Sequence, residues 1–186
     1  ATQVPGTVPS FSVDNAASVT SRGFEFDATW FVNDLVTVGV DYAYTDATYD
    51  DFSGTPSCPA SALVNGVCDL SGFPLIFAPK HKGGAHFEFF DKNAFGDWGA
   101  GFRIDGTILD SYFTDIAYAN SSFEDGYGLV GASIRLVSPD ERFTISLVGK
   151  NLTEEAILQW GIPTGPNSLA SLRAPREIAL KVSARF

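Results

Sequence analysis

The chain is poor in several features that define other classes of protein. It has no methionine, two cysteines and two histidines among its 186 residues, and charged residues make up only 18%. Nothing in it is rich in alanine, glutamate, lysine and leucine at a helical period, which excludes a coiled coil. Aromatic residues reach 13%, which excludes a chain that is disordered throughout.

Long apolar runs and basic residues are also scarce. No stretch approaches the roughly 18–20 consecutive apolar residues of a membrane-spanning helix. That absence excludes only the helical way of crossing a bilayer, because the strands of a membrane barrel are apolar at alternate positions alone. Twelve basic and 22 acidic residues give a net charge of −10, which repels phosphate backbones. We therefore expect no nucleic-acid partner.

The few cysteines and histidines favour structure over chemistry. Cys58 and Cys68 lie ten positions apart in a stretch rich in proline, serine and glycine. Such an isolated pair favours a disulfide over a metal site, which would need more ligands nearby. His81 and His86 fall on opposite faces of an extended segment and are not expected to share a metal. We predict no metal and no cofactor.

Alternation of apolar and polar residues is the main signal that is present. The clearest case is the end of the chain, where residues 178–186 place an apolar side chain at every second position. The same period of two recurs in seven other segments: 11–14, 24–32, 36–45, 85–90, 100–108, 130–136 and 143–150. This pattern predicts an all-β, antiparallel chain of about eight strands.

Two architectures explain this alternation. In a soluble sandwich the apolar face points into a core, and in an outer-membrane barrel it points at lipid. The longest of these segments run for 9–10 residues, which suits the roughly 9–11 that cross a bilayer at a tilt. The connections alternate between short turns and long loops, the long ones being 48–82, 110–126 and 153–174. We favour a transmembrane β-barrel segment with its short turns in the periplasm.

Four stretches of the sequence carry a family resemblance. They are Asn15–Ala17 leading into Ser21–Glu25, then Val40–Ala47, Val148–Leu152, and Ala174–Glu177 running to the terminal Arg185 and Phe186. In order and spacing the chain resembles the last eight strands of a TonB-dependent outer-membrane receptor. The terminal Phe186, after alternating apolar residues, is similar to the signal read by the barrel-assembly machinery.

The resemblance implies a 22-stranded barrel with a plug domain inside it. Residues 1–186 would form the C-terminal portion, about the last third of the barrel, with the plug and the N-terminal strands absent from this chain. An open arc has two unpaired edges, which hydrocarbon does not tolerate. We therefore expect the remainder of the same receptor to pair with those edges, either as a second chain or as a missing N-terminal part.

The resemblance also implies a function. It predicts an active-transport receptor of the bacterial outer membrane, not an enzyme, which takes up a scarce ligand such as a ferric siderophore and is energised by TonB through the plug. Outer-membrane lipid, lipopolysaccharide and a small-molecule or metal-chelate ligand are the other expected partners. Two alternatives stay open: a self-contained eight-stranded barrel with a structural or enzymatic role, and a secreted carbohydrate-binding β-sandwich.

Candidate functional residues lie in the loops and on the polar face. Aromatic rings gathered in a loop either bind a ligand or pack on a neighbouring loop, and both readings apply to Tyr112, Phe113, Tyr118, Phe123 and Trp160. Charges facing the barrel lumen hydrate the wall, pair with each other or dock a plug; those named as candidates are Glu25, Asp27, Glu88, Arg103, Asp105, Arg135 and Lys150. The acidic residues Asp46, Asp50 and Asp51 suit calcium, although a solvated loop is the favoured reading.

Overall fold

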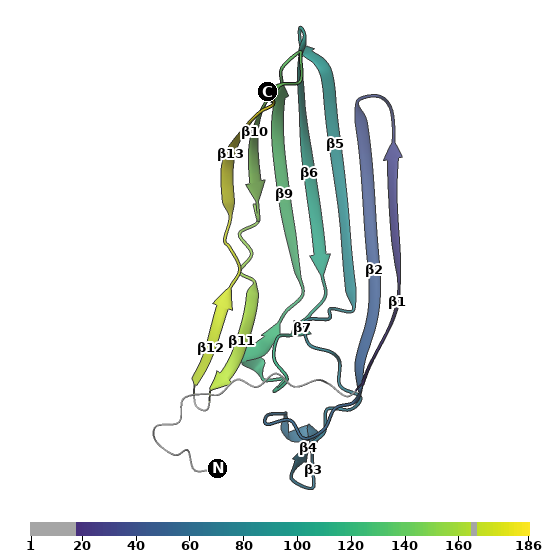
Figure 1. The fold of residues 1–186 in the computed structure, drawn as a ribbon, viewed down its shortest axis with the longest axis vertical. Coiled ribbons are helices and arrows are strands. Elements are labelled where there is room, and N and C mark those ends of the chain that lie inside the picture. The colour runs from purple at the N-terminus through teal and green to yellow at the C-terminus, as the bar shows by residue number, and fades with distance from the viewer. Residues whose placement is uncertain (1–17, 165–166) are drawn as a thin grey trace.

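The main feature of the fold is one antiparallel sheet of seven strands. A computed structural model of the chain describes residues 18–164 and 167–186. Figure 1 shows the strands side by side in a single layer. In spatial order they are β1 (Ser18–Phe31), β2 (Val36–Asp51), β5 (His81–Phe95), β6 (Trp98–Leu109), β9 (Tyr127–Val137), β10 (Phe143–Lys150) and β13 (Glu177–Ala184). The segment expected at 11–14 lies outside the described residues.

Short turns lie at one end of this sheet and long loops at the other, as the sequence predicts (Figure 1). The loops contain small elements of their own: η1 (Ala60–Ala62), β3 (Leu63–Val64), β4 (Val67–Cys68), β7 (Tyr112–Phe113), η2 (Asn120–Ser122), β8 (Phe123–Glu124), β11 (Leu158–Thr164) and β12 (Asn167–Leu172). The predicted long connection over 153–174 contains a hairpin of its own, because β11 and β12 pair there. Gly161 and Pro163 conceal this strand from a reading based on alternation.

The strands also extend further toward the long loops than their apolar alternation predicts. Asp46, Asp50 and Asp51 lie in the outer end of β2, not in a loop. There the pairing with β1 continues, and the Thr20 hydroxyl donates a hydrogen bond of 2.7 Å to Asp50. Polar residues continue the strand because cross-strand backbone hydrogen bonds do not require an apolar side chain.

The register sorts the side chains onto two faces. Phe87 lies opposite Val38 on one neighbouring strand and Ile104 on the other, and the row continues through apolar or small residues to Ile178. The adjacent row runs through Glu88 and Arg103 on the opposite face. Since side chains alternate across a strand, one face is apolar and the other carries the charges. The predicted two-sided wall is confirmed.

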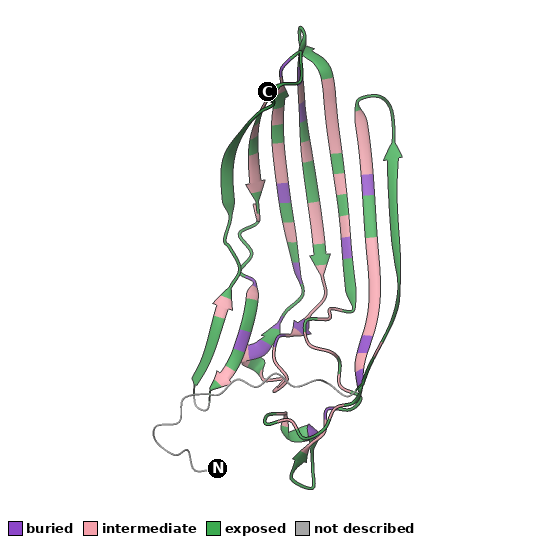
Figure 2. Cartoon of the chain, in the orientation of Figure 1, coloured by how far each residue is buried: buried purple, intermediate pink, exposed green. Residues whose placement is uncertain are grey.

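No layer of the described chain covers the apolar face. Trp30 and Ile178 are each 67% exposed, and Figure 2 shows the strands mostly exposed or partly exposed. Buried apolar side chains lie mainly where the long loops meet the strand ends, as Leu70, Tyr112 and Ile157 do. A soluble sandwich would bury the apolar rows between two sheets, and the described structure does not.

The sheet is an open part of a barrel. β1 and β13 stand at the two ends of the strand order, and the described residues do not pair them with each other. The closed eight-stranded barrel is therefore not the arrangement found in the described chain. No helix in the described part is long and apolar enough to cross a membrane.

Candidate functional site: the packed outer loops and the charged face

The three long loops pack against one another. We call them the first loop (52–80), the second loop (110–126) and the third loop (151–176). The first and second loops meet where the Tyr118 hydroxyl donates to the Pro74 carbonyl at 2.5 Å. Nearby, the Phe77 amide donates to the Phe113 carbonyl at 2.8 Å. The Tyr118 ring also packs on Phe73, with 5.2 Å between centroids.

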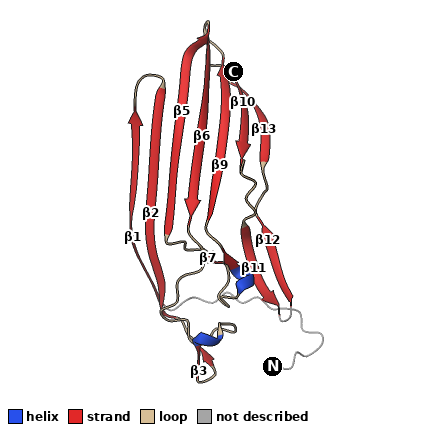
Figure 3. Cartoon of the chain, turned by 180° about the vertical axis from the view of Figure 1, so that it is seen from behind, coloured by secondary structure: helices blue, strands red, loops and turns tan. Residues whose placement is uncertain are grey.

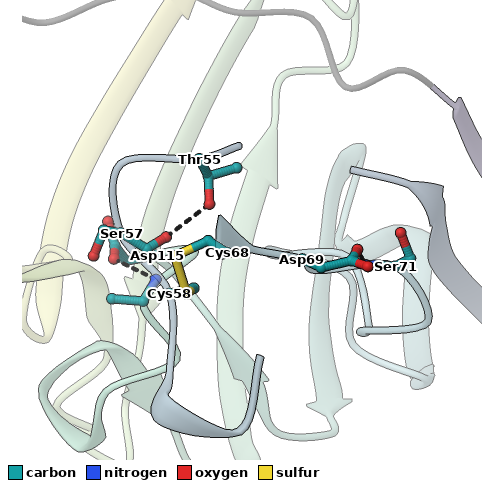
Figure 4. Close-up of a disulfide and its surroundings, with 8 residues drawn as sticks. Thr55, Ser57, Cys58, Cys68, Asp69, Ser71 and Asp115 are labelled. Carbon is teal, nitrogen blue, oxygen red and sulfur yellow. Dashed lines mark hydrogen bonds between the residues drawn. A yellow bond between two sulfur atoms is a disulfide. The ribbon is translucent and has the colours of Figure 1, made fainter. Parts of the chain in front are cut away.

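A small core and a disulfide hold the first loop together. Tyr49, Ala62 and Leu70 are buried in this core, and Tyr118 of the second loop packs against it. Cys58 and Cys68 form the predicted disulfide beside it (Figure 4). By closing a short loop, the cross-link restricts the unfolded ensemble and so favours this packed form.

The second and third loops are joined by buried hydrogen bonds. The Gly161 amide donates to Thr114 Oγ1 at 3.0 Å, and that hydroxyl donates to the Ser122 carbonyl at 3.0 Å. A second link is the Leu158 amide, which donates to the Glu124 carboxylate. Figure 3 shows the β11–β12 hairpin beside the short helix of the second loop. The second loop therefore connects its two neighbours.

Burial divides the five aromatic residues that the sequence singles out. Tyr112 is only 6% exposed and packs with Tyr127 and Ile157, and Tyr118 is held by the first loop. Phe123 and Trp160 are 38% and 37% exposed. The ring of the partly buried Phe113 packs against that of Phe123 in a tilted arrangement, with 4.8 Å between centroids. Ligand contact by any of the five stays a prediction, but three of them retain accessible ring surface.

Phe77 belongs with these rings, although the sequence analysis does not identify it. Its side chain is 51% exposed, and its ring lies 6.2 Å from that of Tyr112. Its backbone has a φ of 56°, which is uncommon for a residue other than glycine. The hydrogen bond that its amide donates to the Phe113 carbonyl holds it there. The flanking residues Pro74 and Pro79 are the one local signal in the sequence for an unusual backbone conformation here.

The two tyrosines of the second loop, Tyr112 and Tyr118, are neutral phenols. Burial, and then the neighbouring Tyr127, raise the pKa of Tyr112 to about 12. Burial also raises the pKa of Tyr118, so that both hydroxyls stay protonated at any physiological pH. Among the described residues, the hydroxyls of Tyr112 and Tyr127 are buried without a hydrogen-bond partner. Tyr118 uses its proton to bind the first loop.

Glu124 makes the packing of the second and third loops sensitive to pH. Burial raises the pKa of Glu124 above its ordinary 4.5, opposed mainly by the hydrogen bond from Leu158. A raised carboxyl pKa means that the packed loops bind a proton more tightly than unpacked loops do. The stabilisation of the packed loops by protonated Glu124 is therefore complete below the ordinary pKa of the carboxyl. It is lost as the pH rises through the raised pKa. We expect Glu124→Gln to flatten this dependence.

Hydrogen exchange of the second and third loops between pH 4 and pH 7 measures the effect, after correction for the intrinsic exchange rate at each pH. Glu154→Gln is the control, because Glu154 is an exposed carboxylate of the third loop that pairs with Arg176. If wild type and Glu124→Gln lose protection in parallel, the assignment to Glu124 is wrong.

On the charged face the structure brings together some of the predicted residues and not others. Arg103 and Arg135 both bind Glu88, and Asp105 lies 4.0 Å from Arg103. Lys150 stands opposite Glu177 in the register of β10 and β13. The remaining two, Glu25 and Asp27, lie on β1, where Asp27 faces Asp41. Two carboxylates directly opposite one another repel.

The two histidines project from opposite faces of the sheet, as expected. His81 Nδ1 lies 2.6 Å from the Tyr42 hydroxyl on the apolar face, among the rings of Phe24 and Tyr44. His86 projects from the charged face, opposite Asp105. In the part of the chain that the structure describes, no group of three or more histidine, cysteine, aspartate or glutamate side chains is placed to hold a metal.

A lipid-type apolar face, a charged face and long loops packed at one end define a class: the wall of an outer-membrane β-barrel receptor. Residues 1–152 match the family model described as "TonB dependent receptor-like, beta-barrel". This match covers most of the chain, and the chain belongs to that family. Its members are outer-membrane receptors of the transport type rather than enzymes.

A solved structure supports the same fold. The ferric yersiniabactin uptake receptor FyuA from Yersinia pestis matches with a TM-score of 0.71 at 15% sequence identity. The match covers 90% of this chain and 24% of that one, so this chain spans about a quarter of the length of FyuA. At such low identity the likeness concerns the fold alone. No curated protein matches the sequence.

Proposed function

We propose that this chain is the C-terminal wall of a bacterial outer-membrane receptor that imports a scarce ligand, a ferric siderophore being the leading candidate. The observation that carries the proposal is the uncovered apolar face of the sheet, backed by a charged face and joined to packed loops at one end. FyuA, a ferric yersiniabactin uptake receptor, has the same fold over the matched part. An iron chelate is therefore the ligand to test first.

The partners follow from the open sheet. Within the described residues, β1 and β13 each present an unpaired edge, and in a bilayer further strands of the same receptor would pair with each edge. A plug within the completed barrel would connect the receptor to TonB as its energy source. Lipid and lipopolysaccharide would cover the apolar face. Phe186, which follows β13 with a fully exposed side chain, would be the contact for the barrel-assembly machinery.

In this proposal the loops divide the work. Tyr112 and Tyr118 hold the three loops together, and the accessible rings of Phe113, Phe123 and Trp160 face the ligand. Aromatic rings supply large contact areas at a low cost in side-chain entropy. The charged face would keep the passage hydrated, and its outermost members would contact ligand on its way inward.

The experiment measures uptake of radioiron-labelled ferric chelates of catecholate, hydroxamate and phenolate type by cells carrying the complete receptor. We expect the best substrate to lose about tenfold in apparent affinity in a Phe123→Ala, Trp160→Ala variant, which corresponds to about 1.4 kcal/mol. Leu169→Ala is the control, since Leu169 is an exposed apolar residue, without an aromatic ring, of the hairpin that carries Trp160.

The uptake experiment has two informative failures. If cells with the receptor take up none of the iron chelates faster than a strain without it, the choice of an iron chelate as ligand is wrong. Equal loss in the aromatic variant and the leucine control would overturn the role given to the rings.

A further inference from the structure

On the charged face, large side chains lie across glycines of the neighbouring strand. Three polar residues of this face each stand opposite a glycine in the register: Asp41 opposite Gly84, His86 opposite Gly39, and Asp105 opposite Gly131. A Cβ added at any of these glycines would lie 2.5 Å or less from an atom of the side chain opposite. Each polar side chain therefore occupies the space that a side chain on the opposite residue would fill.

Glycines of the apolar face show the contrast. At Gly83, Gly106 and Gly128 an added Cβ would meet no atom of the described residues nearer than 3.4 Å. The exception on that face is Gly149, which lies beneath Leu152. A glycine in this sheet is thus not covered by necessity, and the cover on the charged face comes from the polar side chains placed opposite.

His86 and Asp105 lean away from each other. They are directly opposite in the register of β5 and β6, where cross-strand side chains come within reach of one another. His86 instead lies over Gly39 on β2, and Asp105 lies over Gly131 on β9. Because β5 and β6 are the two strands between β2 and β9, the two side chains point outward from this pair of strands and leave the wall low between them.

The wall around these residues is also polar. Thr107 continues the row of Asp41 and Gly84 with a short side chain. Asp41 and Asp105 are exposed, so their carboxylates stay hydrated while they lie along the sheet. We call this surface, formed on the charged face by the middle of β2, β5, β6 and β9, the low wall. Any residue larger than glycine beneath these side chains would lift them into the lumen.

We propose that Gly39, Gly84 and Gly131 set the clearance along the low wall and thereby determine how bulky a polar chelate the receptor imports. The inference rests on the proposed function and adds a limit of size to its substrate. The selectivity of a transport pathway depends on its width and on the polar groups that line it. At all three glycines the obstructing atoms belong to side chains and not to backbone, so an added Cβ displaces a side chain into the passage and leaves the strands paired.

The test measures import by cells carrying the complete receptor. The probe is the radioiron-labelled chelate of catecholate, hydroxamate or phenolate type that these cells import best, with and without an attached, uncharged benzoyl group. Gly84→Ala with Gly131→Ala should slow import of the benzoylated chelate at least about tenfold and that of the parent chelate less, since one methylene in excess in a close-fitting site discriminates by about 10–200-fold. Surface binding measured without an energy source should change little, because the loops are untouched.

Rescue by a second substitution separates clearance from stability. Asp105→Ala in the Gly131→Ala background removes the displaced carboxylate and should restore import of the benzoylated chelate. This pair also serves if the double glycine variant fails to assemble. Gly106→Ala is the matched control, because Gly106 lies in β6 on the apolar face and an added Cβ there meets no atom nearer than 3.9 Å. Equal slowing of both chelates, or no recovery with Asp105→Ala, overturns the proposal.

Thiol labelling tests the clearance without any ligand. Thr107→Cys places a thiol on the low wall beside Gly84. In the complete receptor, Gly84→Ala should slow labelling of this thiol by a bulky methanethiosulfonate reagent at least about tenfold more than labelling by a small one. If the cells import no chelate but this pattern appears, the proposed ligand is wrong and the inference stands. Equal slowing of the two reagents shows that the glycines do not set the clearance.

Discussion

Replacing Leu147 by arginine is expected to lower the free energy of unfolding of the receptor in a bilayer by about 2–4 kcal/mol. Leu147 lies in the middle of β10, between Ile134 and Leu180 on the neighbouring strands. Its side chain is 48% exposed in the isolated sheet. In the bilayer that exposed surface meets acyl chains, and hydrocarbon cannot solvate a guanidinium.

The adjacent Val148 provides the matched control, because it projects from the opposite face between Ser133 and Ala179. Val148→Arg introduces the same side chain at the same depth but into the hydrated lumen, and we expect a change of less than about 1 kcal/mol. Reversible unfolding in lipid vesicles by a denaturant series measures both. Equal destabilisation by the two substitutions would mean that the apolar rows do not face lipid.

The strands are predictable from sequence because a half-buried strand leaves a local trace. Alternation at every second residue identifies all seven described strands of the sheet, and the register then follows because a slip by one residue would invert every side chain. The short turns are predictable as well, because they are the few residues between two consecutive alternating segments. The ends of β2 and β5 are not, because beyond the apolar rows only backbone pairing holds the strands.

The contacts between loops could not be read from the sequence. Thr114 and Gly161 are 47 residues apart, and nothing in either neighbourhood signals the other. The β11–β12 hairpin is hidden similarly, since Pro163 and Gly161 are residues that usually interrupt strands. The disulfide was predictable because its two cysteines are alone in one polar stretch.

Charge pairing lies between these two cases. The sequence places Glu88, Arg103 and Arg135 on one face, but their meeting depends on which strands are neighbours in the sheet. The Phe90 ring lies 4.5 Å from the guanidinium carbon of Arg135. This contact depends in addition on the space above Gly101, which only the three-dimensional register reveals. Residues that break the alternation therefore warrant inspection as supports for a polar group.

Gly161→Val is expected to separate the third loop from the second and to cost about 2–5 kcal/mol of local stability. A Cβ at Gly161 would lie 2.0 Å from the Ser121 carbonyl oxygen. Because the obstacle is backbone, the hairpin itself must move away. That movement breaks the bond from the Gly161 amide to Thr114, leaving buried polar groups unpaired. Hydrogen exchange should show the second and third loops losing protection together, while β6 and β9 stay protected.

The control for this substitution is Ala170→Val, because Ala170 is the cross-strand partner of Gly161 in the hairpin and its side chain is exposed. It introduces the same valine at an exposed position of the same hairpin, and we expect the local stability to change by less than about 0.5 kcal/mol. Uptake of the best ferric chelate should fall with Gly161→Val, because Trp160 moves with the hairpin away from Phe123. Unchanged protection of the second loop in Gly161→Val would show that the second and third loops are independent and that their packing does not shape the outer mouth.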